Sequence, residues 1–308
     1  MHSFFYKSAY LISLFVNIII FIVGGKAVID GAITIGSYTI IVTYFSFIMS
    51  ALKYFFGLGG QTQATLVSLD RLNEITDRKV LQEGEIYDDE IKEIRLENIS
   101  FSYDSEPIFH NYSQVFSRGK VYAVTGENGK GKSTLLKLLS GLYTEEMQGE
   151  IYINSKAIGE YNMKKMRGET ISFCEQDSVL LSGDLYDNLF IHETGQVDES
   201  KYLELRKILN LESILPPCLD SLKEFFINEK SSNLSGGERQ KLALMRSLFP
   251  SAQLFLLDEP TASLDMATKH RLMEYIDKIK QHSIIVMVTH EAELTKKADI
   301  FISLDKIQ

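Results

Sequence analysis

The N-terminal part of the chain carries two long apolar stretches that are almost free of charge. Eighteen uncharged residues follow Lys7, and 22 more follow Asp30. A helix needs about 20 mostly apolar residues to cross a bilayer, so the pattern predicts membrane spans over about residues 8–25 and 34–56. The second stretch follows at once and no small-residue cleavage site precedes it, which favours a helical hairpin over a secretory signal peptide.

Basic residues set the expected orientation of this hairpin. Lys53, Arg71, Arg78 and Lys79 flank the end of the second span, so that side is expected to face the cytoplasm. The pattern then predicts a multi-pass protein of the cell membrane, with the rest of the chain on the cytoplasmic side. Apolar residues at helical spacing extend the second span as a cytosolic helix to residue 79.

The hydrophobic pattern changes after this helix. Residues 80–93 are rich in acidic side chains and predict a solvated linker. From Ile94 apolar and polar residues alternate, as they do in a half-buried strand. We therefore expect a hairpin with its extension over 1–79, a linker over 80–93 and a globular domain over 94–308.

Charge and cysteine content exclude some functions. The 32 Lys and Arg residues are outnumbered by 41 Asp and Glu residues, which gives a formal net charge of −9. Non-specific nucleic-acid binding depends on basic side chains that neutralise phosphates, so no nucleic-acid partner is expected. Two cysteines, Cys174 and Cys218, are too few for a disulfide framework.

A phosphate-binding pattern stands between a predicted strand and a predicted helix. Residues 126–133 read GENGKGKS and match G-x-x-x-x-G-K-S. The glycines let backbone N–H groups converge on phosphates, and the helix N-terminus adds its positive dipole end. Lys132 is expected to reach the β- and γ-phosphates, and Ser133 to hold Mg²⁺. The expected ATP contacts in this loop are Gly126, Glu127, Asn128, Gly129, Lys130, Gly131, Lys132, Ser133 and Thr134.

Two adjacent carboxylates end an apolar run. Residues 254–257 are all apolar, which is typical of a strand buried on both faces of a parallel sheet. Asp258 at the end of this strand is expected to bind Mg²⁺ directly or through water. Glu259 is expected to polarise the attacking water as a general base.

A third motif precedes that strand. Residues 234–241 read LSGGERQK, with a serine and two glycines before an amphipathic helix, so that backbone amides point outward at the helix N-terminus and suit a γ-phosphate. This octet resembles the signature of ATP-binding-cassette (ABC) ATPases. The resemblance implies that the signature binds the ATP of a partner cassette through Leu234, Ser235, Gly236, Gly237 and Glu238.

The resemblance extends to further positions. Tyr103 resembles the aromatic residue that stacks on adenine, Gln176 the glutamine that touches Mg²⁺, and His290 the switch histidine that contacts the γ-phosphate. Glu229 resembles the acidic position that touches the transmembrane domains in exporters. The loop that joins the two active sites of a cassette pair is matched by Ala262, Ser263, Leu264 and Asp265.

The family resemblance implies an α/β P-loop ABC ATPase domain with an inserted helical subdomain over about 178–245, preceded by an all-α transmembrane helical hairpin. The implied reaction is hydrolysis of MgATP to ADP and phosphate, with a second copy or a related subunit as partner. The hairpin resembles the last two of the six transmembrane helices of an exporter subunit. The chain is thus expected to act as a partial subunit that exports an unidentified substrate with the help of additional transmembrane helices.

Two questions stay open at this level. A membrane-tethered ABC ATPase fragment, or a regulatory subunit with no transport activity of its own, has the same motifs. Gly57, Gly59 and Gly60 also stand where the last membrane helix should run on, and their helical penalty of about 1 kcal/mol per glycine relative to alanine leaves open whether that helix is continuous.

Overall fold

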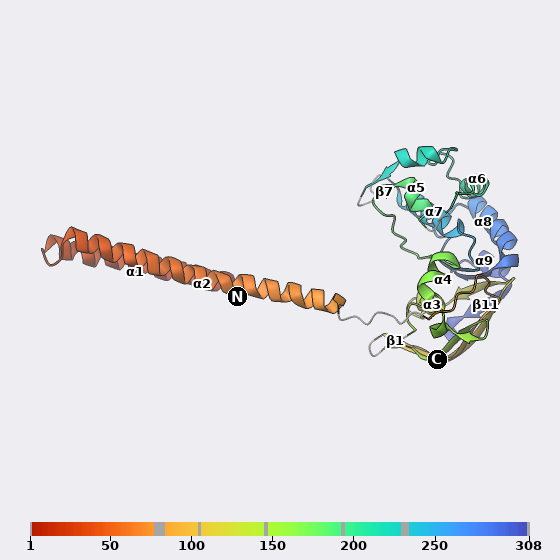
Figure 1. The fold of residues 1–308 in the computed structure, drawn as a ribbon, viewed down its shortest axis with the longest axis horizontal. Helices are drawn as coiled ribbons and strands as arrows, with labels where there is room; N and C mark the ends of the chain where they lie inside the picture. The colour runs from red at the N-terminus through yellow and green to blue at the C-terminus, as the bar shows by residue number, and fades with distance from the viewer. Residues whose placement is uncertain are drawn as a thin grey trace. The chain divides into compact units, whose positions relative to one another are not determined.

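The computed structural model describes residues 2–76, 84–103, 106–144, 147–191, 195–228 and 234–306. The chain divides into two compact units, Met1–Val80 and Leu81–Gln308. Figure 1 shows the first unit in red and orange and the second in yellow to blue. Each unit has its own architecture and is described by itself.

The first unit is a helical hairpin of α1 (His2–Ile29) and α2 (Ile35–Thr76), which lie side by side (Figure 1). The Thr34 hydroxyl accepts a hydrogen bond from the Ser37 N–H at 3.1 Å and so caps the start of α2. A Cβ on Gly24 would lie 2.6 Å from the Tyr38 ring, so this glycine lets the ring lie against α1.

The question of helix continuity at Gly57, Gly59 and Gly60 is answered by α2, which runs through all three as one helix of 42 residues. Adding a residue to an existing helix needs no new nucleus. The modest helical penalty of three glycines is therefore insufficient to break a helix that continues on both sides.

The hairpin turns its apolar side chains outward. Within α2, Ile35–Leu52 is long and apolar enough to cross a membrane, and none of this segment is buried. A shorter apolar segment, Leu14–Ile29, lies in α1 among the residues whose side chains are described. Phe15, Phe21 and Phe47 each expose more than 70% of their surface.

The second unit is built on a five-stranded parallel sheet in the order β11-β3-β10-β9-β6. Its strands are β3 (Val121–Thr125), β6 (Ile171–Cys174), β9 (Leu254–Asp258), β10 (Ile284–Val288) and β11 (Ile300–Ser303). Every residue of β9 and β10 is buried, as the apolar run at 254–257 predicted for β9.

An antiparallel sheet in the order β2-β1-β4-β5 packs against this parallel sheet. It consists of β1 (Glu93–Tyr103), β2 (Glu106–Ser117), β4 (Gln148–Ile153) and β5 (Lys156–Ala157). The alternation from Ile94 predicted β1, and its buried side chains do alternate with more exposed ones. A two-stranded sheet pairs β7 (Gly183–Asp184) with β8 (Phe226–Ile227).

Helices cover the parallel sheet on both faces, as expected for an α/β domain. They are α3 (Lys132–Leu139), α4 (Met163–Glu169), α5 (Leu185–Leu189), α6 (Glu199–Ile208), α7 (Gly236–Leu248), α8 (Met266–Ile279) and α9 (Ala292–Lys297). Short 3₁₀ turns occupy η1 (Ile158–Glu160), η2 (Asp220–Glu224), η3 (Lys280–His282) and η4 (Leu304–Lys306). The region expected to be the helical subdomain contains α5, α6 and most of α7.

Two hydrophobic clusters lie on opposite faces of the parallel sheet. Successive side chains of a strand point to opposite faces, so Leu254 and Leu256 of β9 join one cluster and Phe255 and Leu257 the other. The first cluster lies between the two sheets and includes α3, and the second holds α5, α6, α7 and α8. This packing fixes the strand ends that carry the candidate site.

The expected solvated linker over 80–93 is wrong from Gly84 onward. Ile91 is fully buried in the core of the second unit, and Ile86 forms a parallel bridge with Tyr161. The Tyr161 hydroxyl donates to Asp88 at 2.9 Å. Apolar residues between the acidic ones let this stretch pack into the core of the second unit, to which it belongs, while its carboxylates stay accessible or hydrogen-bonded.

Candidate functional site

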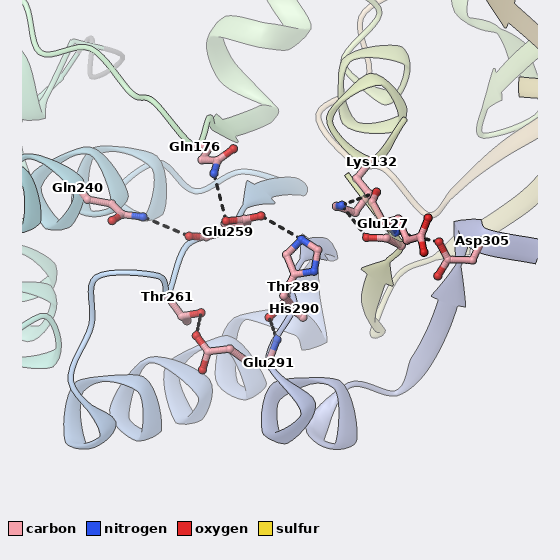
Figure 2. A network of polar contacts seen from close by, with 11 residues as sticks. Glu127, Lys132, Gln176, Gln240, Glu259, Thr261, Thr289, His290, Glu291 and Asp305 are labelled. Atoms are coloured by element: carbon pink, nitrogen blue, oxygen red, sulfur yellow. Dashed lines mark hydrogen bonds and ion pairs between the residues drawn. The ribbon is translucent and has the colours of Figure 1, made fainter. Parts of the chain in front are cut away.

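The candidate residues meet where the parallel strands end. The phosphate loop follows β3, Gln176 follows β6, Glu259 follows β9 and His290 follows β10. Because the carboxyl ends of parallel strands meet at one edge of a sheet, ligands of such folds bind there. Figure 2 shows these side chains converging from separate elements.

The phosphate loop has glycines at positions where the backbone favours glycine. Gly129 and Gly131 have φ angles of +83° and +84°, in the left-handed region that favours glycine. A Cβ on Gly131 would collide with Ile108 of β2, and α3 begins here without a side-chain cap. The Lys132 ammonium donates to the carbonyl oxygens of Gly126 at 2.7 Å and Glu127 at 3.0 Å (Figure 2). The loop therefore presents uncapped helix amides and a lysine, which suits phosphates.

Asp258 and Ser133 bring two oxygen donors together beside the phosphate loop. The Asp258 side chain is buried, and burial raises the pKa of its carboxyl, whereas a hydrogen bond from Ser133 and the nearby Lys132 charge act to lower it. Carboxylate and hydroxyl oxygens are ligands that Mg²⁺ prefers. Within the described residues no group of three or more His, Cys, Asp or Glu side chains is arranged so that it could hold a metal ion. The donor set fits an ion that takes one or two protein ligands and fills its shell with phosphate and water oxygens.

Three elements hold Glu259. Gln176 Nε2 donates to Glu259 Oε2 at 3.1 Å, and His290 Nε2 lies 3.3 Å from Glu259 Oε1. Gln240 Nε2, on α7, donates to the Glu259 carbonyl oxygen at 3.1 Å (Figure 2). Glu259 has a φ of +48°, a conformation that costs a non-glycine residue about 1 kcal/mol or more. The surrounding hydrogen bonds thus fix both the backbone and the carboxylate of this residue.

The signature residues form the start of α7. The Ser235 hydroxyl accepts from the Glu238 N–H at 3.3 Å, and Glu238 Oε2 accepts from the Ser235 N–H at 2.6 Å. This reciprocal pair is a capping box, and the Ser235 N–H lowers the pKa of the Glu238 carboxyl. A Cβ on Gly236 or on Gly237 would meet no atom closer than 3.9 Å, so the first turn is open on that side.

Tyr103 lies at the end of β1, with 41% of its surface exposed. Its ring stands edge-on to Phe101, with the ring centroids 5.0 Å apart. Phe101 pairs in register with Phe109 of β2. The Phe109 ring lies beside Gly131 of the phosphate loop, where a Cβ added to Gly131 would contact it. The β1–β2 hairpin therefore brings Tyr103 close to the phosphate loop.

The expected inter-site loop leads directly into α8. The Asp265 carboxylate caps this helix, with Oδ1 accepting from the Thr268 N–H at 2.9 Å and Oδ2 accepting from the Thr268 hydroxyl at 2.8 Å. These bonds lower the pKa of Asp265. Leu264 is buried, and Ser263 lies beside Gly237. Glu229 lies outside the described residues.

Sequence reasoning missed several polar residues at the site. Gln240 belongs to the signature octet and Glu291 directly follows His290. Their places in the sequence, next to predicted site residues, could therefore have identified both as candidates. Thr261 lies in the turn after Glu259. Asp305 had no such signal, yet its Oδ1 accepts from the Glu127 N–H at 2.8 Å and so supports the phosphate loop.

Comparison with known proteins gives a consistent family. The model of the family described as ABC transporter matches residues 109–262, which is half of the chain. The ATP-dependent lipid A-core flippase 2 of Colwellia psychrerythraea is 29% identical over 89% of this chain and 47% of the relative. The putative export ATP-binding/permease protein of Rickettsia felis is 29% identical over 98% of this chain and 53% of the relative. The chain thus spans about half the length of these relatives.

A solved structure shows the same fold. A bacterial Atm1-family ABC exporter with ATP bound aligns with a TM-score of 0.65 and 20% sequence identity. The alignment covers 98% of this chain and 54% of the exporter chain. The likeness therefore includes the helical hairpin as well as the second unit.

Proposed function

Since the chain belongs to the ABC transporter family, we propose that it hydrolyses MgATP to ADP and phosphate and couples this reaction to export across a membrane. The observation that carries the proposal is the arrangement of Glu259, which Gln176 and His290 hold at the same strand edge as the phosphate loop. Such a carboxylate beside a phosphate site can activate water. A purely nucleotide-binding module would need no such residue.

ATP binding is assigned to the phosphate loop and to Tyr103. The amides of residues 126–134 bind the phosphates, and Lys132 exchanges its present carbonyl partners for the β- and γ-phosphate oxygens. Tyr103 stacks on adenine, because the β1–β2 hairpin brings its exposed ring close to this loop.

The chemistry of hydrolysis is assigned to residues around Glu259. Ser133, Asp258 and Gln176 would hold Mg²⁺, which neutralises charge on the β- and γ-phosphate oxygens when bound. Glu259 accepts the proton of the attacking water as a general base, a role worth about 10²–10⁴ in rate. His290 contacts the γ-phosphate and keeps the carboxylate oriented through its contact with Glu259 Oε1.

A second cassette completes each ATP site in this proposal. The first turn of α7 is open at Gly236 and Gly237, and its amides suit the γ-phosphate of an ATP held by the partner. The partner is a second copy of the chain or a related subunit. The loop of residues 262–265 joins the two sites, since Ser263 lies against Gly237.

The hairpin and the names of the relatives support export. The relatives include a lipid A-core flippase and export ATP-binding/permease proteins, and the exposed apolar segment of α2 suits a lipid bilayer. We propose that the protein lies in the cell membrane with the cassette on the cytoplasmic side. Additional transmembrane helices line the pathway, because two such hairpins pack as a bundle that fills its own centre.

The proposal is tested with Glu259→Gln in the full chain reconstituted in lipid nanodiscs. The amide keeps the shape of the side chain but cannot accept a proton, so we expect the ATP hydrolysis rate to fall by about 10²-fold or more while ATP binding is retained. Phosphate release measures the rate, and a fluorescent ATP analogue measures binding. Hydrolysis by the variant within a few-fold of wild type would show that Glu259 is not the general base.

A further inference from the structure

Glu291, the residue after the switch histidine, makes several short polar contacts at the edge of the site. Its Oε1 accepts from the Thr261 hydroxyl at 2.9 Å. The Lys269 ammonium donates to both of its carboxylate oxygens at 2.8 Å. Figure 2 shows its carboxylate turned toward Thr261, on the far side of the loop from the imidazole of His290.

The two partners of Glu291 belong to segments that matter for the reaction. Thr261 is 2% exposed and follows Glu259 by two residues, and its carbonyl accepts from the Leu264 N–H at 3.0 Å inside the inter-site loop. Lys269 lies in the first turn of α8, and its N–H donates to the Asp265 carbonyl at 2.9 Å. One carboxylate therefore connects the turn after Glu259 with the helix that begins at the inter-site loop.

The backbone of Glu291 is also fixed. Its N–H donates to the Thr289 hydroxyl at 3.1 Å, and its carbonyl accepts from the N–H and the hydroxyl of Thr295, at 3.1 Å and 3.0 Å. These bonds connect Glu291 to Thr289, which precedes His290, and to Thr295, which follows it. Because the Glu291 backbone is fixed in this way, it can hold the neighbouring His290 imidazole 3.3 Å from Glu259 Oε1.

The charge pair of Lys269 and Glu291 is more enclosed than the other pairs on α8. The two side chains are 17% and 33% exposed, whereas those of Lys278 and Glu204, which join α8 to α6, are 66% and 41% exposed. Loss of one partner from a partly enclosed pair leaves the other charge without compensation, while exposed pairs contribute little. The Lys278–Glu204 pair is thus a matched control on the same helix.

We propose that Glu291 is a positioning residue that couples the switch histidine to the inter-site loop. Its carboxylate holds Thr261 and Lys269 together, so that His290 and the turn after Glu259 keep one fixed relative position. This proposal rests on the proposed ATPase function. The role is distinct from that of a catalytic residue, because Glu291 acts through His290 and Thr261 and not on the phosphate itself.

The first test follows the NMR resonance of the His290 imidazole, a measurement that does not require hydrolysis. The full chain in lipid nanodiscs is isotopically labelled at its six histidines. The resonance that disappears in His290→Gln is assigned to His290. Lys269→Met is expected to move this resonance, although Lys269 is far from His290 in sequence, because the Lys269 ammonium binds the adjacent Glu291. Lys269→Arg, which keeps the charge, and Lys278→Met are expected to leave the resonance in place. An unmoved resonance in Lys269→Met would overturn the coupling.

The second test separates catalysis from binding in the same samples. For Lys269→Met we expect kcat to fall about tenfold with a KM for ATP within about twofold of wild type, because a small misplacement of reacting groups affects turnover more than affinity. Thr261→Val removes one hydroxyl donor of Glu291 and leaves its ion pair with Lys269 in place, so we expect it to lower kcat by a smaller factor; it provides a second variant if Lys269→Met folds poorly. Lys269→Arg and Lys278→Met are expected to stay within about twofold of wild type.

The outcomes distinguish this proposal from the function on which it rests. An unchanged kcat, or a KM that rises as much as kcat falls, would overturn the positioning role, since the pair would then stabilise only the fold. A wild-type chain that binds ATP without hydrolysing it would refute the proposed ATPase function. In that case the His290 resonance alone decides whether Glu291 couples the two loops.

Discussion

Apolar residues are exposed in the hairpin of α1 and α2 and buried in the second unit, Leu81–Gln308, which we call the cassette. In the hairpin, Phe15, Phe21 and Phe47 turn most of their surface outward, whereas every residue of β9 and β10 in the cassette is buried. Apolar surface is favourable only away from water. The hairpin therefore needs an apolar surrounding that its own two helices do not provide, while the cassette buries its apolar residues within itself.

Polar groups show the reverse contrast. In the hairpin they serve the helices, as when the Thr39 and Thr43 hydroxyls donate to carbonyls one turn earlier. This is the arrangement expected of a segment in lipid, where backbone and side-chain polar groups must be satisfied internally. In the cassette polar side chains from distant segments converge at the strand ends, around Glu259. The polar groups of the hairpin thus suit a lipid surrounding, whereas those of the cassette suit a site at which a reaction takes place.

The largest difference should appear with matched truncations. Leu256→Ala in β9 removes a fully buried side chain, and we expect it to lower the free energy of unfolding of the cassette by about 2–5 kcal/mol. Ile41→Ala in α2 removes a side chain that is 50% exposed and should leave that value unchanged. The chain has no tryptophan, so urea unfolding is followed by circular dichroism. Equal effects of the two substitutions would contradict the contrast.

A charge placed on the apolar surface tests the hairpin side of the comparison. Phe47→Lys puts an ammonium within the segment Ile35–Leu52, and a lysine at the centre of a membrane helix costs about 3 kcal/mol of insertion free energy. We expect a smaller membrane-bound fraction after carbonate washing, with ATP affinity of the cassette unchanged. Phe47→Leu is the matched control and should behave as wild type. Full membrane retention of Phe47→Lys would argue against a spanning segment here.

The reciprocal change tests the cassette side. Lys132→Ala removes the ammonium of the phosphate loop, and the loss of one charge-assisted interaction is expected to weaken ATP binding by about 2 kcal/mol. Membrane retention should not change. The control is Lys156→Ala, an exposed lysine of β5, which should bind ATP as wild type does. Unaltered ATP affinity in Lys132→Ala would remove this lysine from the site.

Local patterns in the sequence predicted a large part of this architecture. The alternation from Ile94 predicted β1, and the apolar stretches predicted the two long helices. Each of these depends on residues close together in the chain. The motifs likewise named Gln176, Glu259 and His290, which the structure brings together.

The features that sequence reasoning missed depend on long-range packing. Gln240 reaches the Glu259 carbonyl only because α7 packs on the face of the parallel sheet to which β9 contributes Phe255 and Leu257. Asp305 reaches the phosphate loop only because β11 pairs with β3. The linker prediction failed for the same reason, since the burial of Ile91 depends on a core assembled from distant segments. The continuity of α2 at Gly57 stayed open for a different reason, because glycine propensity is a weak local term against a long helix.

The most direct test of the whole account asks whether one chain unites a membrane part with an ATP-hydrolysing part. The wild-type chain and Glu259→Gln are reconstituted with liposomes and floated through a density gradient, and ATP hydrolysis is measured in every fraction. We predict that both proteins float with the lipid and that only wild type hydrolyses ATP there, with the rate of the variant lower by about 10²-fold or more. Wild-type protein that stays with its activity at the bottom of the gradient, or a floating Glu259→Gln variant as active as wild type, would contradict it.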